Sequence, residues 1–243
     1  MTTNTLRVVS ALLCYPQPEL IAALPELATL VREDRELPVV ERGRLVDFID
    51  ELRESDLWEL QERYVALFDR GRKLSLHLFE HIHGESRERG QAMVDLLEVY
   101  RRGGYELAAK ELPDYLPLFL EFLSTRPADE ARSLLDDASH VIALLGARLA
   151  ERHSPYAAAF DALLALVDAP ADLGEIRAQA ATEGPDRTIT EMDKIWEEEQ
   201  VTFLANQAPD GGCGAGSGAQ TNAQPVAFAP PRNVRAPAPR PVL

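Results

Sequence analysis

The sequence predicts an all-α protein: a single helical-bundle domain of roughly ten helices over residues 1–206, followed by a disordered tail over residues 207–243. Three observations lead to this prediction. Apolar residues recur three and four positions apart along almost the whole body, with no convincing two-residue alternation of the kind that strands show. Prolines and glycines interrupt these helical patterns at short intervals. After about Asn206 the pattern ends, and seven of the 17 prolines lie in the tail, which is too poor in apolar residues to order itself.

The first part of the chain predicts four helices. Their apolar positions lie over residues 6–13, 20–31, 45–52 and 56–68. Pro25 falls early in the second pattern, where it would kink or split a helix. Asp56 and Glu59 have the spacing of a capping box and mark the start of the fourth helix.

The central stretch is the most unusual part of the chain, because it combines three of the five histidines with many charges and large apolar residues. It predicts a helix over Arg72–Ile82 that Gly84 ends, and a second over Ser86–Tyr100 that Gly103 and Gly104 end. Apolar residues and histidines surround the first of these helices on nearly every side. Such a helix must be deeply buried or present one face to a partner.

Four more helices are expected after the central stretch. Their apolar positions lie over residues 116–123, 134–149, 156–167 and 189–203. Asp114 is the expected N-cap of the first, and Pro127 opens the second, a long one. Ser154 is the expected N-cap of the third, and Thr188 with Glu191 forms a capping box for the last.

The charge and the cysteines narrow the function classes. The net charge of the whole chain is −15, and that of the helical body is −17, because the tail holds one acid and three arginines. Such a surface repels nucleic acids and anionic lipid heads and favours a basic peptide as partner. Cys14 and Cys213 form neither a disulfide framework nor a CxxC pair, and no signal peptide or membrane span is recognisable. A protein of the cytoplasm is therefore expected.

Several motifs carry a family resemblance. The runs FDRGR, SLHLFEHIHGES and RGQAMVDLL are followed by ELPDYLPLFLEFL and WEEEQV, in this order. Together they resemble the NarJ-type assembly chaperones of respiratory nitrate reductase, within the wider TorD-like family of molybdoenzyme chaperones. One position departs from the family pattern, since Tyr115 stands where histidine is usual.

The resemblance implies a chaperone, not an enzyme, and no cofactor of its own. Such a chaperone binds the apo catalytic (alpha) subunit of nitrate reductase, including its N-terminal segment, and enables molybdenum cofactor insertion and assembly before membrane docking. Cofactor-biosynthesis proteins are further candidate partners. A chaperone of the same family that serves another molybdoenzyme is the alternative.

A partner-binding groove is expected around the central stretch. An apolar groove between helices binds an amphipathic peptide helix, and acids near it attract the basic residues of the peptide. The candidate residues are Tyr64, Leu67, Phe68, Asp69, Arg70, Leu74, Leu78, Phe79, Glu80, His81, His83, Glu85, Arg87, Arg89, Pro113 and Asp114. The charged residues among them also suit a different role, a self-paired network that joins two helices.

A metal-dependent enzyme is the second hypothesis. His77 and His81 are four residues apart, with His83 nearby, and this spacing suits zinc when all three lie on a helix. However, HExxH is absent, no cysteine is near, and a hydrogen-bonded core histidine is the commoner explanation for His77 among its leucines. No metal site is therefore predicted.

Overall fold

A computed structural model describes residues 3–84, 86–107, 111–167, 170, 172–184 and 186, and within these ranges it contains helices and no strand. The elements in chain order are α1 (Thr3–Leu12), α2 (Pro18–Glu33), α3 (Val39–Glu54), α4 (Leu57–Tyr64), the π-helical turn η1 (Val65–Asp69), α5 (Leu78–His83), α6 (Glu88–Arg102), α7 (Leu116–Ser124), α8 (Ala128–Asp137), α9 (Ser139–Glu151), α10 (Ala157–Leu164) and α11 (Leu173–Thr182). The predicted all-α class is confirmed.

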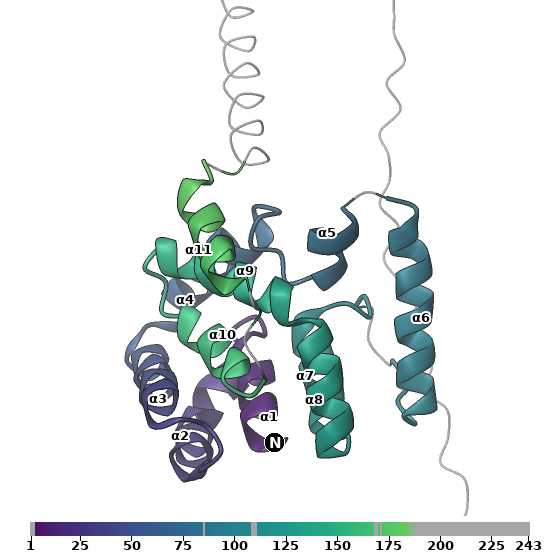
Figure 1. Cartoon of the computed structure of the whole chain (residues 1–243). Helices are drawn as coiled ribbons and strands as arrows, with labels where there is room; N and C mark the ends of the chain where they lie inside the picture. The colour runs from purple at the N-terminus through teal and green to yellow at the C-terminus, as the bar shows by residue number, and fades with distance from the viewer. Residues whose placement is uncertain are drawn as a thin grey trace, which may run out of the picture. The chain divides into compact units, whose positions relative to one another are not determined.

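Helix α1 is central to the first half of the core. It packs against α2, α7 and α10, so the start of the chain meets segments more than one hundred residues away (Figure 1). Its apolar side chains Leu6, Val9 and Leu12 are almost completely buried, as the helical spacing requires. The Ser10 hydroxyl also donates a hydrogen bond to the Pro117 carbonyl of α7, over 2.7 Å.

Helix α9 has the same role in the second half, where it packs against α5, α8, α10 and α11. The contact with α10 is especially close. A Cβ atom added at Gly146 would lie 3.0 Å from the Cβ of Phe160, so glycine allows the two helices to approach.

Helix α6 lies beside α5, and Leu96, Val99 and the buried Tyr100 pack it against the core (Figure 1). The ring of Tyr100 is buried, with its centroid 4.6 Å from that of Phe122 in α7. Its hydroxyl donates a hydrogen bond to the Pro113 carbonyl over 2.6 Å. The predicted stop of this helix is confirmed, because α6 ends before Gly103, and Gly104 has a φ of +76°.

Several predicted boundaries were wrong. Pro25 does not split the second helix, since α2 continues through it from Pro18 to Glu33. The long helix expected after Pro127 is divided into two helices, α8 and α9, which are separated at Ala138. Ser154 does not cap α10, whose N-cap position is Tyr156, and the buried Ser154 hydroxyl has no hydrogen-bond partner within the described chain.

One helix of the structure was not predicted, and some predictions concern residues that the structure does not describe. Helix α11 was not predicted, since its apolar positions are few. The helix expected from Thr188 and the tail over residues 207–243 lie outside the described residues, as does the boundary between the two expected domains.

The close approach of α9 and α10 gives a stability prediction. Gly146→Val should lower the free energy of unfolding by about 1 to 3 kcal/mol, because the new side chain must displace Phe160. Gly43→Val is the matched control, since a Cβ atom at this exposed helical position meets no atom within 4 Å. Urea denaturation of both variants measures the difference. Equal stabilities would show that the interface between the two helices tolerates the added volume.

Candidate functional site

A π-helical turn forms one wall of a pocket of about 790 Å³. The capping box at Asp56 is confirmed in part, since its carboxylate accepts from the Trp58 amide over 2.8 Å and α4 begins there. At Val65 the helix widens into η1, and the Arg70 amide donates to the Val65 carbonyl over 3.1 Å, five residues back. The wide turn buries Phe68 and leaves Asp69 exposed at the pocket.

The segment from Arg72 to His77 is not helical, so the helix predicted over Arg72–Ile82 is wrong in its first half. Lys73 and Leu74 form a turn, and Leu74, Ser75, Leu76 and Leu78 are all buried. The Leu116 amide donates to the Leu76 carbonyl over 2.8 Å, and the Leu78 amide donates to the Asp114 carbonyl over 3.0 Å. These bonds hold the segment against the start of α7 and leave only Leu78–His83 to form α5.

The buried carboxylate of Asp114 caps α5. Its side chain is 0% exposed, and it accepts one hydrogen bond from the Phe79 amide over 3.1 Å and one from Nδ1 of His77 over 3.2 Å. Nη2 of Arg89 lies 3.9 Å from the same carboxylate. The prediction that Asp114 caps the helix that follows it was wrong. It satisfies the free amides of a helix 35 residues earlier, and Tyr115 has the N-cap position of α7.

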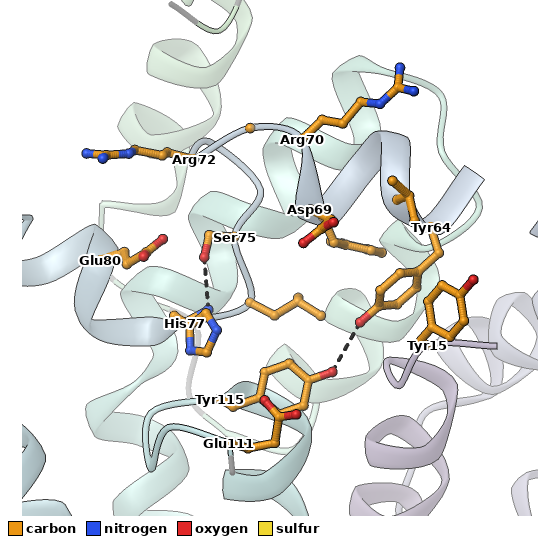
Figure 2. Close-up of a pocket in the computed structure, with 14 residues that line it drawn as sticks. Tyr15, Tyr64, Asp69, Arg70, Arg72, Ser75, His77, Glu80, Glu111 and Tyr115 are labelled. Carbon is orange, nitrogen blue, oxygen red and sulfur yellow. Dashed lines mark hydrogen bonds between the residues drawn. The ribbon is translucent and has the colours of Figure 1, made fainter. Parts of the chain in front are cut away.

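The pocket has a volume of about 790 Å³ and lies between α4, η1, the segment before α5 and the start of α7. Figure 2 shows its labelled side chains gathered around one space. The lining residues are Tyr15, Tyr64, Val65, Phe68, Asp69, Arg70, Gly71, Arg72, Ser75, Leu76, His77, Glu80, Glu111 and Tyr115. Its walls are aromatic and aliphatic, and its polar side chains include three carboxylates and two guanidinium groups.

Two of the tyrosines that line the pocket, Tyr64 and Tyr115, form a directed chain of hydroxyl groups. The Tyr64 hydroxyl donates to the Leu13 carbonyl over 3.0 Å, and it lies 3.1 Å from the Tyr115 hydroxyl (Figure 2). Because Tyr64 uses its proton on Leu13, Tyr115 donates to Tyr64 and keeps oxygen lone pairs for the pocket. Burial raises the pKa of Tyr115 to about 12, so the pair is neutral. The pocket therefore offers an acceptor at this point.

The structure brings together part of the predicted site. Tyr64, Phe68, Asp69, Arg70 and Glu80 line the pocket. Leu78 and Phe79 line a different, apolar groove of about 440 Å³ along α6. The remaining predicted residues within the described chain line neither cavity, and they are Leu67, Leu74, His81, His83, Arg87, Arg89, Pro113 and Asp114. Glu85 lies outside the described residues.

Sequence analysis missed several pocket residues, notably Tyr15, Arg72, Glu111 and Tyr115. Tyr15 follows α1 and is 39% exposed, which is a high value for a large aromatic side chain. Its ring packs edge-on against Tyr64, with the centroids 5.5 Å apart. Arg72, Glu111 and Tyr115 had a signal in the sequence, because they belong to the motifs FDRGR and ELPDYLPLFLEFL that carried the resemblance, whereas Tyr15 had none.

The histidines have structural partners, which does not support the metal hypothesis. His77 precedes α5 and bonds Asp114, whereas Nε2 of His81 donates to the Ser75 carbonyl over 2.8 Å. The two rings therefore do not share one helix face. Within the described chain, no group of three or more His, Cys, Asp or Glu side chains is placed to hold a metal ion.

The charged junction between α5 and α6 pairs internally to a large extent. Arg89 lies 3.3 Å from Glu80 in addition to its contact with Asp114, and His83 lies 3.9 Å from Glu88. The self-paired network that the sequence left open is thus present, but Glu80 also faces the pocket.

Comparison with known proteins identifies the family. The family model described as nitrate reductase delta subunit matches residues 22–162, which is more than half of the chain. The chain belongs to this family. The nitrate reductase molybdenum cofactor assembly chaperone NarJ of Escherichia coli K12 is 45% identical over 207 residues, covering 85% of this chain and 86% of the relative. NarW of the same organism, also named as such a chaperone, is 42% identical over 203 residues, covering 84% and 85%.

A solved structure is also similar. It is described as a redox enzyme maturation protein from Archaeoglobus fulgidus, with 23% identity, a TM-score of 0.49, and coverage of 67% of this chain and 91% of that one.

The named relatives in the delta subunit family are assembly chaperones, and this chain is likewise an assembly chaperone and not an enzyme. No helix within the described residues is long and apolar enough to cross a membrane.

The contact between His77 and Asp114 predicts a pH dependence of stability. The hydrogen bond to Asp114 raises the pKa of His77 above its ordinary value of 6.5, although burial opposes the shift. A histidine with a raised pKa in the folded state stabilises that state below its unfolded pKa, and the contribution disappears as the pH rises through the folded pKa. The stability difference between the wild type and His77→Gln should therefore be largest near about pH 6 and shrink towards about pH 9. Urea denaturation across this range measures it. A difference that does not change with pH would mean that the charge on His77 does not contribute.

Proposed function

We propose that this chain is a dedicated cytoplasmic chaperone of the apo catalytic subunit of a respiratory nitrate reductase, and that the pocket binds the N-terminal segment of that subunit. Binding there would precede molybdenum cofactor insertion and membrane docking. We infer the identity of the client from the names of the relatives, which are nitrate reductase molybdenum cofactor assembly chaperones. We infer the position of the peptide site from the chemistry of the pocket.

The arrangement of acids around an aromatic floor supports a peptide ligand. Tyr15, Val65 and Tyr115 line the pocket with exposed or partly exposed side chains and offer apolar area for one face of a short amphipathic helix. Asp69 and Glu111 are exposed at the pocket and form no ion pair within the described chain, so they are available for lysine or arginine. The Tyr115 oxygen adds an acceptor for a further donor. This combination is the observation that carries the proposal.

The two arginines of the pocket do not contradict a basic ligand. Arg70 lies at the end of η1, and its exposed side chain extends away from Tyr64 and Tyr115 (Figure 2). An arginine at the rim of the pocket can bind a helix C-terminus or an acidic residue of the client, and the three carboxylates can bind basic residues of the client. The client segment should therefore carry charges of both signs, with the basic ones near Glu111.

Substitution of single acidic residues tests whether the pocket binds the client peptide. Glu111→Gln should weaken the binding of a synthetic peptide of the client N-terminus by about 3- to 10-fold, because it removes one charge that attracts the peptide and leaves the fold unchanged. Glu80→Gln should weaken it as well, although part of the effect comes from releasing Arg89. Glu54→Gln is the control, since this exposed residue of α3 does not line the pocket. Isothermal titration calorimetry measures the affinities. If the two pocket variants bind as tightly as the control, the peptide site lies elsewhere.

Salt should weaken the same interaction. As the ionic strength rises from about 0.01 to 0.15 M, the Debye length shrinks from about 30 to 8 Å, and charges at the exposed rim are increasingly screened. The peptide affinity of the wild type should fall over this range, and that of Glu111→Gln should fall less. A peptide affinity that does not depend on salt would mean that apolar contacts alone hold the client.

A further inference from the structure

The segment that lines the pocket between η1 and α5 has little regular backbone pairing of its own. Residues 70–77 contribute six of the pocket-lining residues. Within this segment the Ser75 amide donates to the Arg72 carbonyl over 3.2 Å, and the Leu76 carbonyl accepts from Leu116. Its conformation must therefore depend on side chains that bind it from behind the pocket.

Arg148 of α9 is the first of these side chains. It is 13% exposed, and Nη1 donates to the Lys73 carbonyl over 2.8 Å. Nε and Nη2 bind the two carboxylate oxygens of Glu183 over 2.9 and 2.6 Å, in the bidentate geometry that makes such pairs strong. One guanidinium group thus joins α9, the pocket segment and the residues that follow α11.

His81 completes the contacts of Arg148. Because Nε2 of His81 donates to the Ser75 carbonyl, the Nδ1 atom of the neutral ring is an acceptor, and it lies 3.5 Å from Nη1 of Arg148. Burial lowers the pKa of His81, and the charge of Arg148 lowers it further, which keeps the ring neutral. The predicted site residue His81 therefore supports the pocket segment from behind and does not line the pocket.

Lys73 is bound from the other direction as well. Its amide donates to Oδ2 of Asp186 over 2.9 Å, and its Nζ donates to the Gly184 carbonyl over 2.7 Å. Asp186 is 6% exposed, and Glu183 lies 3.5 Å from Nζ of Lys73. Both backbone polar groups of Lys73 are thus bound by side chains from other parts of the chain, the carbonyl by Arg148 and the amide by Asp186.

We propose that Arg148, Glu183 and Asp186 form a clasp that positions the pocket segment for the client, so that peptide affinity depends on the residues that follow α11. This inference rests on the proposed function for its ligand. If the pocket segment must be ordered before the peptide binds, the apparent peptide affinity is the intrinsic affinity multiplied by the fraction of molecules in which the segment is ordered. By thermodynamic linkage, a peptide in the pocket stabilises the clasp to the same extent.

Substitutions of Asp186 test the clasp. Asp186→Ala removes the acceptor for the Lys73 amide, whereas Asp186→Asn keeps an oxygen in the same place. Asp186→Ala should accelerate hydrogen exchange of the Lys73 and Ser75 amides about tenfold in the free protein and weaken peptide binding about fivefold or more. Asp186→Asn should restore both values to near those of the wild type.

Arg148→Met gives an independent variant, and Arg44→Met is its control. Arg44 also joins two helices, through a contact of 3.3 Å between its Nη1 and Asp161, but it does not touch the pocket segment. Arg148→Met should reproduce the changes of Asp186→Ala, and Arg44→Met should produce neither. Circular dichroism verifies that each variant is folded before it is compared.

The two proposals fail in different ways. If the wild type does not bind the client peptide, the proposed function is wrong. The amide hydrogen-exchange rates of Lys73 and Ser75 then still test whether the clasp positions the pocket segment. If Asp186→Ala and Arg148→Met are folded and bind the peptide as the wild type does, or leave these exchange rates unchanged, the clasp does not position the pocket.

Discussion

The carboxylate of Asp114 is the group on which the geometry of the pocket depends most. It is completely buried and lies between the segment before α5 and the first turn of α7. A buried carboxylate is tolerated only where hydrogen-bond donors surround it, and here a free amide of α5, the ring of His77 and, more distantly, Arg89 do so. Removing one partner from such a buried charged group typically costs about 3 to 5 kcal/mol. The position of α5 is thus fixed by a residue distant in sequence.

The pocket segment is consequently held near both ends. At His77 it is bound by Asp114 and by a bridge to Tyr115, and at Lys73 it is bound by Arg148 and Asp186. Between these two points the Ser75 amide and carbonyl and the Leu76 carbonyl are also bound, by Arg72, His81 and Leu116 in turn. A segment that is held along its length before the ligand arrives loses little conformational entropy on binding.

The sequence predicted the helices that pack by one apolar stripe, because their spacing records local geometry directly. It failed at Leu74–Leu78, where the leucines fit one face of a helix, and contacts with Leu116 and Asp114 hold the segment in a non-helical conformation. The prediction that Asp114 caps the helix after it was wrong, because spacing along the chain cannot reveal a distant helix. The same holds for Arg148, which sequence spacing marks only as a polar position within a helix.

The candidate site was predictable only where it is local. Tyr64, Phe68, Asp69 and Arg70 belong to one continuous run, and the structure places all four at the pocket. Tyr15 reaches the pocket because the end of α1 is next to α4, and no pattern within either segment indicates this contact. Tertiary contacts of this kind decide which exposed residues share a cavity.

The π-helical turn has a consequence for related sequences. Adding or removing one residue in a helix rotates everything beyond it by about 100° around the axis. The wide turn of η1 accommodates one residue more than an α-helical turn would, and this sets the direction in which Asp69 and Arg70 leave the helix. A homologue that lacks one residue between Val65 and Asp69 would form a regular helical turn there and keep the acid in nearly the same direction, because the wide turn absorbs the extra residue. The π-helical turn therefore allows relatives that differ by one residue in this short stretch to share the acidic wall.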